Sequence, residues 1–530
     1  DIQQEAASGD ITLLPQKTNL IYQTSLIYCF NDEQSLYYID KEFNFYAFHI
    51  PTQKNEFIAN LGKEIQERGK ISSIVHYHNS YFVGFLMDGI LLLEKQKETN
   101  HYQIQSLPIN SGVFCLKKDR FQDVVWIGTD GQGVYLYSNP LYSIKSMVLS
   151  NYTEKIERPV RAIYLDDERT FWVGTKGNGI LKIYDYEFDK NISDCRAEVL
   201  TTSNSALSSN AVYCFAKSHR NLLWIGDEEG LTYYSYREKR IKSIPIRIGN
   251  EDFKYIHDIY ETADSELWLA SVGMGVVKAR IAGTSDNPVI VDAQRYIIND
   301  GELGSNYFFT IYAENEANLL FGNKGYGVFR YNETTNGLEP VSTHKYENMT
   351  LNNILAISKD SSNNYLFGTS YGLIKYTSET SYQLFNAKNG FLNNTIHAIL
   401  RNSSDDFWLS TNLGLINFDT KRNVFRSYGF GDGLKVVEFS DGAAFRDSQT
   451  GTLFFGGING VVAIRADGRP EQLYMPPVYF DKLSIFGEQY NLGEFLTRKK
   501  ETEVLNLQYD QNFFSVSFAS VDYLNGNNCT

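Results

Sequence analysis

The sequence is poor in the residues that mark several common classes of protein. Only 11 Pro and five Cys occur among its 530 residues. The Cys residues form no C-x-x-C pair and show no zinc-type spacing, which argues against a zinc module. Isolated thiols of this kind are usually buried in core strands, and the sequence leaves one disulfide open. The five are Cys29, Cys115, Cys195, Cys214 and Cys529.

Positive charge and long apolar runs are also in short supply. The net charge of −14 disfavours a generic nucleic-acid-binding protein, although it leaves room for a local basic pocket. No apolar run is long enough to predict a membrane-spanning helix. No signal peptide is visible, and the chain opens at Asp1 without an initiator Met, so we expect a processed or excised segment.

Aromatic residues, by contrast, are abundant and repeat in a fixed phrase. Phe, Trp and Tyr make up 14% of the chain, which favours β structure. The segment FWVGTKGNGILKIYD, which starts at Phe171, returns as LWIGDEEGLTYYS, YLFGTSYGLIKYT and FWLSTNLGLINFD. Each copy alternates apolar and polar residues around a Gly-containing turn, which is typical of a β-hairpin. This alternation argues against helical repeats of similar length.

The copies can be aligned on the Gly of WVGT, and successive positions then lie 42 to 52 residues apart. A period in the forties is the length of one four-stranded propeller blade. A second set of apolar residues lies upstream, at Val160, Val212, Ile256, Phe308, Ile354, Ile396 and then Gly442. The aligned positions are Ile39, Gly84, Gly128, Gly174, Gly226, Ala270, Gly322, Gly368, Ser410 and Gly456.

The repeat predicts how the blades pack. The aromatic of each hairpin should contact the next blade, and the Gly should let the neighbouring sheet approach closely. The five Trp residues are therefore expected in the core rather than at a cofactor. They are Trp126, Trp172, Trp224, Trp268 and Trp408.

The predicted fold class is all-β, in three parts. Residues 1–150 are expected to form the last three blades of a first, incomplete propeller. Residues 151–470 are expected to form a seven-bladed β-propeller, and residues 476–530 the start of an Ig-like β-sandwich, because period-two strands follow a Pro-containing linker. A short three-blade cap or an unusual ring is the alternative for the first part.

These patterns resemble a known family. The W-x-G-T blade is similar to the regulator-propeller repeat of hybrid two-component sensors from Bacteroides-type bacteria. The segment EFSDGAAFRDSQTGTLFFGGINGVVAI, residues 438–464, resembles the closing blade of that family. The segment LNLQYDQNFFSVSFASVDYLNGN resembles the start of its triple-tyrosine domain. The resemblance covers nearly the whole chain, and the ordered combination of motifs is more specific than any single blade.

The resemblance implies a periplasmic ectodomain that senses a glycan-derived oligosaccharide and controls glycan-utilisation genes. It also implies a homodimer, tethered to the inner membrane through a downstream helix outside this chain, with no nucleic acid bound by this segment. Kinase activity would lie outside the chain. The chain departs from the family pattern in having three first-propeller blades, an incomplete sandwich, and no kinase or DNA-binding segment.

Candidate ligand-binding residues follow from the repeat register, because loops that lead into the innermost strands gather around the axis of a propeller. These positions vary between blades and include rings that can stack on sugars and groups that can bind hydroxyls or acids. The bland alternative is that each Asn caps its own turn and that His257 and His397 are structural. The candidates are Arg158, Arg161, Tyr213, Lys254, Tyr255, His257, Asn306, Tyr307, Asn394 and His397.

No catalytic or cofactor motif accompanies these candidates. HExxH, GxSxG, P-loop and EF-hand patterns are absent, and the segments SSDDFWLS and ADSELWLA lack the Gly and Thr of a sialidase Asp box. We therefore predict no enzyme activity, no cofactor and no resident metal for this segment. Propellers also host polysaccharide lyases, glycosidases and peptide-binding scaffolds, and these readings stay open as alternatives.

Overall fold

The structure is a computed structural model. It describes residues 2–4, 11–13, 26–32, 34–96, 101–138, 142–151, 156–298, 306–341, 352–378, 380–391, 393–432, 434–466, 477–499, 502–521 and 523. The chain divides into two compact units: one of Asp1–Pro140 with Gln472–Gly526, and one of Leu141–Glu471 with Asn527–Thr530. Each unit is described by itself.

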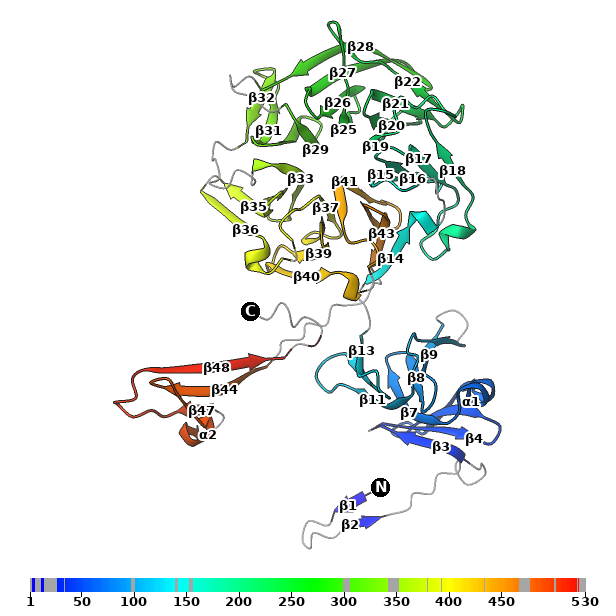
Figure 1. Cartoon of the computed structure of the whole chain (residues 1–530), viewed down its shortest axis with the longest axis vertical. Coiled ribbons are helices and arrows are strands. Elements are labelled where there is room, and N and C mark those ends of the chain that lie inside the picture. The colour runs from blue at the N-terminus through cyan, green and yellow to red at the C-terminus, as the bar shows by residue number, and fades with distance from the viewer. Residues whose placement is uncertain are drawn as a thin grey trace. The chain divides into compact units, whose positions relative to one another are not determined.

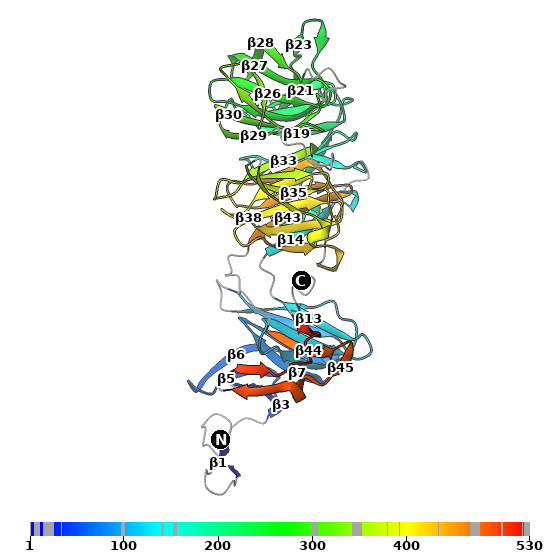
Figure 2. The same ribbon diagram turned by 90° about the vertical axis from the view of Figure 1, so that its left-hand side faces the viewer.

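The described strands of the second unit form seven four-stranded antiparallel sheets, which we call blades 1 to 7, and one small hairpin of β23 (Arg247–Ile248) and β24 (Glu251–Asp252) (Figures 1 and 2). The innermost strands of successive blades contact one another, and the last contacts the first, so the sheets close into a propeller. Blade 1 comprises β15 (Val160–Leu165), β16 (Phe171–Thr175), β17 (Ile180–Ile183) and β18 (Ala197–Leu200). Blade 2 comprises β19 (Val212–Lys217), β20 (Leu222–Asp227), β21 (Gly230–Ser235) and β22 (Arg240–Ser243).

The next four blades follow the same order from inside to outside. Blade 3 is β25 (Ile256–Glu261), β26 (Glu266–Ser271), β27 (Gly275–Thr284) and β28 (Asn287–Tyr296). Blade 4 is β29 (Phe308–Asn315), β30 (Asn318–Asn323), β31 (Gly327–Asn332) and β32 (Gly337–Pro340). Blade 5 is β33 (Ile354–Lys359), β34 (Tyr365–Thr369), β35 (Gly372–Ser378) and β36 (Ser381–Phe385), and blade 6 is β37 (Ala398–Arg401), β38 (Asp406–Thr411), β39 (Gly414–Asp419) and β40 (Val424–Tyr428).

Blade 7 is completed by a strand from the other end of the unit. It contains β41 (Phe439–Arg446), β42 (Leu453–Gly457) and β43 (Gly460–Ala466), and its outermost strand is β14 (Tyr142–Val148). The register runs from Tyr142 opposite Ala466 to Val148 opposite Gly460. The predicted boundary at residue 150 is therefore wrong, since residues 142–148 hydrogen-bond into the ring. This pairing joins the first and last strands of the propeller, so the only edges left in the seven sheets are the short ones of the single blades.

The aligned Gly positions allow the blades to approach one another, as the repeat predicts. A Cβ added to Gly174 would lie 2.7 Å from Val212 of the next blade, and one added to Gly456 would lie 2.6 Å from Val160. Gly226, Gly322 and Gly368 meet the corresponding Ile of their neighbours in the same way. Trp172, Trp224, Trp268 and Trp408 are buried in the core, whereas Trp126, in the first unit, is only half-buried.

The first unit contains a fan of three sheets. β3 (Leu26–Asn31), β4 (Ser35–Asp40), β5 (Asn44–His49) and β6 (Lys54–Asn60) form one sheet, followed by helix α1 (Gly62–Arg68). β7 (Ile71–Tyr77), β8 (Ser80–Phe85), β9 (Ile90–Lys95) and β10 (Tyr102–Ser106) form the second, and β11 (Val113–Lys118), β12 (Val124–Thr129) and β13 (Val134–Ser138) form the third. β1 (Ile2–Gln4) pairs with β2 (Ile11–Leu13).

Two outer faces of this fan are exposed, which corrects the expectation of buried thiols. Cys29 on β3 and Cys115 on β11 are exposed, and Cys195 of the propeller is intermediate. Only Cys214 is buried among the four Cys residues that the structure describes, and all four are free. Cys29 and Cys115 lie on strands that have a neighbouring sheet on one side only in the described part of the unit. Cys529 lies outside the described residues.

The C-terminal segment forms two small sheets. β44 (Val478–Ile485) pairs with β45 (Glu488–Tyr490) and with β48 (Phe514–Ser520). Helix α2 (Leu492–Phe495) leads to the hairpin of β46 (Leu496–Lys499) and β47 (Thr502–Leu505). The segment is thus β-rich, as the alternating sequence predicts.

Candidate functional site

Every one of blades 1 to 5 has a β-bulge in its innermost strand. Val160 pairs with Thr175 and Ala162 pairs with Gly174, which leaves Arg161 outside the ladder. A bulge re-aims the extra side chain away from the sheet, so its identity is free of the packing that fixes its neighbours. This explains why the position varies among otherwise regular repeats. The corresponding residues in blades 2 to 5 are Tyr213, His257, Phe309 and Leu355.

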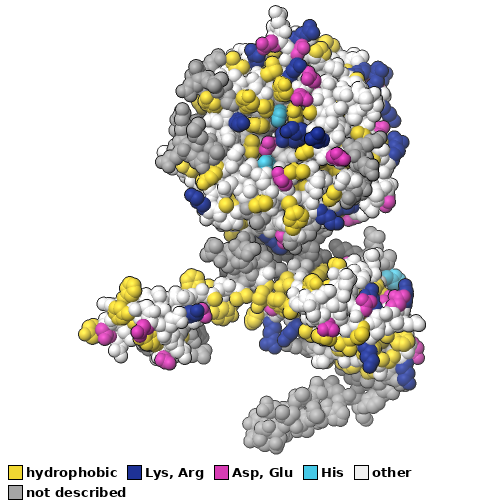
Figure 3. Space-filling model, viewed as in Figure 1, with side chains coloured by type: hydrophobic (Ala, Val, Ile, Leu, Met, Phe, Trp, Pro, Cys, Tyr) yellow, Lys and Arg dark blue, Asp and Glu magenta, His cyan; other side chains and the backbone are white. Residues whose placement is uncertain are grey.

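The bulge side chains meet at the centre of the ring. The Arg161 guanidinium carbon lies 5.9 Å from the centroid of the Tyr213 ring. Tyr213 stacks on His257 with centroids 4.4 Å apart, and His257 contacts the edge of Phe309 at 5.7 Å. Figure 3 shows Lys or Arg, His and acidic side chains gathered near the centre of the ring. We call Arg161, Tyr213, His257, Phe309, His397 and Asp441 the axial network.

Asp441 joins the two ends of this network. Its Oδ1 accepts a hydrogen bond of 2.5 Å from Nδ1 of His397, in blade 6, and its Oδ2 lies 3.6 Å from Nη1 of Arg161, in blade 1. The other ring nitrogen of His397 lies 2.7 Å from Oδ1 of Asn412. Burial alone would raise the pKa of Asp441, but the hydrogen bond from His397 and the charge of Arg161 hold it below its usual value. Asp441 is therefore ionised at neutral pH.

His257 has the opposite environment. Burial, with a smaller contribution from the positive charges of Arg161 and Lys176, lowers its pKa to about 3, although the charge of Asp441 opposes the shift. The imidazole is therefore neutral at neutral pH and serves as an aromatic surface between Tyr213 and Phe309. Of the predicted candidates, the structure thus brings the bulge residues Arg161, Tyr213 and His257 together with His397, which directly precedes β37.

The segments that lead into the innermost strands form a rim around this centre. We call this side of the propeller, which also holds the turns between the second and third strands of each blade, the entry face. Val272 donates its backbone N–H to the carbonyl of Tyr255 and bridges to Tyr307, whose carbonyl accepts from the N–H of Lys324. Backbone pairing therefore continues from one blade to the next. It holds the side chains of the rim in fixed positions.

Tyr255 and Tyr307 are two aromatic side chains on this rim in neighbouring blades. Tyr255 is 41% exposed and Tyr307 is 42% exposed, unlike the buried Tyr residues between the sheets. Tyr255 has a φ of 56°, which is strained for an aromatic residue, and its backbone groups hydrogen-bond to Glu228 and Val272. Exposed rings fixed in this way can stack on a sugar face.

The remaining candidates are divided between solvent and structural roles. Arg158 is exposed, beside Glu157. Lys254 forms an ion pair of 2.5 Å with Glu229. Asn306 accepts the backbone N–H of Ile298 through its side chain, and Asn394 accepts that of Ala387. Both amides thus stabilise loops of the entry face, which fits the structural role that the sequence left open for the Asn residues.

Three residues at this site were missed by the repeat register. Lys176 and Lys324 stand at the same turn position in blades 1 and 4, in the matching segments TKGNG and NKGYG, and this shared pattern could have revealed them. The sequence aligns Gly442 with the apolar position of the other blades, but Phe439 takes that position and residues 440–443, Asp441 among them, form an enlarged bulge. No sequence signal distinguishes that enlarged bulge from the regular one.

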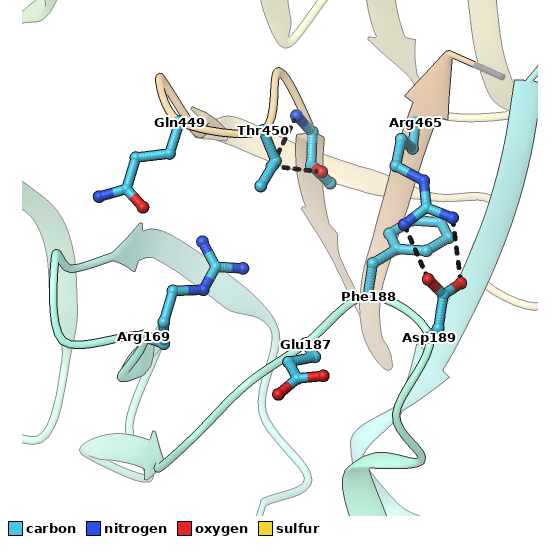
Figure 4. Close-up of a pocket in the computed structure, with 8 residues that line it drawn as sticks. Arg169, Glu187, Phe188, Asp189, Gln449, Thr450 and Arg465 are labelled. Carbon is cyan, nitrogen blue, oxygen red and sulfur yellow. Dashed lines mark hydrogen bonds and ion pairs between the residues drawn. The ribbon is translucent and has the colours of Figure 1, made fainter. Parts of the chain in front are cut away.

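The opposite face of the ring holds a cavity of about 260 Å³ between blades 1 and 7 (Figure 4). Arg465 forms a bidentate ion pair with Asp189, at 2.9 and 3.0 Å, and lies over the ring of Phe188. Arg169 pairs with Asp447 at 2.9 Å. Because both cations already have carboxylate partners, these contacts tie the closing blade to the first one and leave little to bind a ligand.

In the described part of the chain, no three His, Cys, Asp or Glu side chains are grouped so that they could hold a metal ion. None of the helices in these residues is long and apolar enough to cross a membrane.

Comparison with known proteins adds the class of the fold. The structure resembles the extracellular domain of a hybrid two-component system from B. thetaiotaomicron, with a TM-score of 0.55 and 22% identity over 99% of this chain and 73% of that one. A second extracellular domain from the same organism covers 98% of the chain and 68% of its own, with 17% identity and a TM-score of 0.49. The first of these likenesses confirms the sequence resemblance at the level of the fold.

The sequence also has a curated relative. Histidine kinase P4 of Formosa agariphila is 24% identical over 383 residues, which are 70% of this chain. The match spans 27% of that kinase, so the chain corresponds to about a quarter of its length. No protein-family model matches the sequence.

Proposed function

We propose that this chain is the periplasmic ligand-sensing region of a hybrid two-component sensor, and that its ligand is a glycan-derived oligosaccharide. The carrying observation is the entry face of the propeller, where two exposed Tyr rings in neighbouring blades border a centre of polar side chains. Sugar recognition uses this combination, because aromatic rings stack on the sugar face while Arg, His and Asp groups bind its hydroxyls. The extracellular neighbours and the kinase relative support the sensor class.

In this proposal the ring is a seven-bladed sensing propeller and the C-terminal segment is the start of an Ig-like sandwich. The sandwich would pass the signal, as a homodimer, to a downstream membrane helix and kinase and from there to glycan-utilisation genes. The pairing of β14 with β43 supports transmission of a signal from the ring. β14 is the first strand of the ring and β43 is the last, and the two are hydrogen-bonded neighbours. A ligand can shift the signalling equilibrium only by its difference in affinity for the two states.

The test is a calorimetric screen of the whole chain against oligosaccharide pools, followed by Arg161→Ala and Tyr307→Ala on any hit. We expect saturable binding without turnover, and a loss of affinity of about tenfold or more in either variant. Tyr382→Ala is the matched control, since Tyr382 on β36 is 40% exposed and lies on the outermost strand of its blade.

Each other outcome has a clear meaning. Cleavage of the oligosaccharide would favour a propeller-fold lyase or glycosidase over a sensor. Binding that survives both changes would place the ligand elsewhere and contradict the entry-face assignment. If none of the pools binds, the oligosaccharide proposal fails.

A further inference from the structure

We infer that the entry face selects an acidic oligosaccharide, one that carries a carboxylate or sulfate beside a sugar ring that stacks on Tyr307. This inference rests on the proposed function and narrows its ligand class. It comes from three cations of the entry face. Lys176 and Lys324 form no ion pair with any residue that the structure describes, and the carboxylate neighbour of Arg161 lies 3.6 Å away.

Lys176 and Lys324 are the first of these cations. They occupy equivalent turns in blades 1 and 4, both are exposed, and neither forms an ion pair with any residue that the structure describes. Some other Lys residues of the propeller are paired: Lys217 lies 2.6 Å from Asp167, and Lys254, on the entry face, lies 2.5 Å from Glu229. An unpaired cation held by a backbone ladder is available to an anionic ligand.

Arg161 is the third cation, and it is incompletely satisfied. Its Nε is buried and has no hydrogen-bond partner in the described part of the chain. Its one carboxylate neighbour, Asp441, lies at 3.6 Å, beyond a good hydrogen bond, because Asp441 is turned to His397 at 2.5 Å. Arg161 and Lys176 both belong to blade 1, and the positive charge of each lowers the pKa of His257.

Acids also lie on this face and offset part of the charge. Asp441 is hydrogen-bonded to His397, Glu229 is paired with Lys254, and Glu228 accepts a hydrogen bond from the Ser209 hydroxyl. Among the described residues, none of these acids forms an ion pair with Lys176 or Lys324. The two ammonium groups therefore remain available to an anionic ligand.

The rings beside these cations specify a sugar rather than a bare anion. The Lys324 ammonium lies 5.7 Å from the centroid of Tyr307, which is 42% exposed. A pyranose stacked on Tyr307 would carry its acidic substituent next to Lys324. Lys324 would form a charge-assisted hydrogen bond with the acidic group, and the Tyr307 ring would contact the apolar face of the sugar. This combination suits a uronic acid or a sulfated sugar.

The test uses pairs of probes that differ only in the acidic group. Calorimetry of the whole chain would compare oligogalacturonate with its methyl ester, and sulfated with desulfated chondroitin oligosaccharides. We expect at least one acidic member to bind about tenfold more tightly than its partner and to weaken as salt is added. The first pair reports a carboxylate and the second a sulfate.

Variants then assign the effect to these cations. Lys176→Met and Lys324→Met should each weaken the acidic probe about three- to tenfold and leave its neutral partner unchanged. Lys421→Met is the matched control, because Lys421 is an exposed Lys in a turn at the opposite face of blade 6. The inference would be overturned if the acidic and neutral probes of each pair bound equally. It would also be overturned if a variant with both Lys176→Met and Lys324→Met bound the acidic probe as tightly as the original protein.

Failure of this inference can be told apart from failure of the sensor proposal. Tight binding of neutral oligosaccharides alone would overturn the acidic ligand and leave the sensor proposal standing. Absence of binding by every oligosaccharide, acidic or neutral, would contradict both. Lys-dependent binding of a single-stranded RNA oligonucleotide without any saccharide binding would replace the sugar with a nucleic acid.

Discussion

His397 and Asp441 are in neighbouring blades, and their side chains meet at the propeller axis with Nδ1 2.5 Å from Oδ1. Both come from irregular parts of otherwise regular innermost strands. The pair closes the axial network between blades 6 and 1, because Asp441 also faces Arg161. Blades 6, 7 and 1 are thus joined at the centre of the ring by polar contacts, whereas apolar contacts join neighbouring blades farther out.

Asp441→Asn tests this central contact. The folded protein holds the pKa of Asp441 below its usual value near 4, so the pair stabilises the fold above that pH and the effect disappears as pH falls through the folded pKa. We expect a loss of about 1–2 kcal/mol in unfolding free energy at pH 7 that shrinks below about pH 4. Urea unfolding across this pH range measures it, and a pH-independent loss would contradict the ion-pair explanation.

Asp227 gives a prediction of the opposite sign. It is fully buried at a position where blades 1, 5 and 6 have Thr175, Thr369 and Thr411, and burial raises its pKa to about 7. Between its usual value near 4 and this raised value the folded state binds more protons than the unfolded one. Stability therefore falls as pH rises through that window.

Asp227→Thr should remove this penalty. The equivalent Thr residues accept a turn N–H and donate to a Gly carbonyl, so the replacement has partners ready. We expect a gain of about 1–2 kcal/mol at pH 8 and a smaller gain at pH 5, measured by urea unfolding. The reciprocal change, Thr369→Asp, should destabilise blade 5 with the same pH dependence. An Asp227→Thr protein that is less stable at pH 8 would contradict the assignment.

Sequence periodicity predicted the parts of the fold that repeat. The Gly positions, the buried Trp residues and the apolar residue opposite each Gly all follow from one constraint, the close approach of neighbouring sheets. The closing strand, Tyr142–Val148, was assigned to the wrong unit because an outermost strand pairs through its backbone and needs no fixed motif. The site was predictable as a set of variable positions. Its contacts were not, since a bulge residue is unconstrained by the repeat and Asp441 lies in a bulge of a different length.

Tyr255 allows a test of strain at the candidate site. Its φ of 56° suits Gly better than any residue with a Cβ, and its ring is 41% exposed. We expect Tyr255→Gly to be about 1 kcal/mol more stable than Tyr255→Ala, although both remove the ring. Thermal unfolding of the two variants measures the difference. If the Ala variant were the more stable, the left-handed conformation at this position would be in doubt.

Gly174→Ala tests the packing rule on which the whole ring is built. A Cβ at this position would lie 2.7 Å from Val212 and 2.9 Å from Ala162, and both neighbours belong to innermost strands that cannot shift without opening the ring. We expect a loss of about 1–3 kcal/mol in unfolding free energy, measured by urea unfolding. Gly337→Ala is the matched control, because its added Cβ would meet nothing closer than 3.7 Å and its φ is not positive. If the two changes lowered the unfolding free energy equally, the loss would reflect the backbone preference of Gly alone. Close approach of the blades would then not require Gly at position 174.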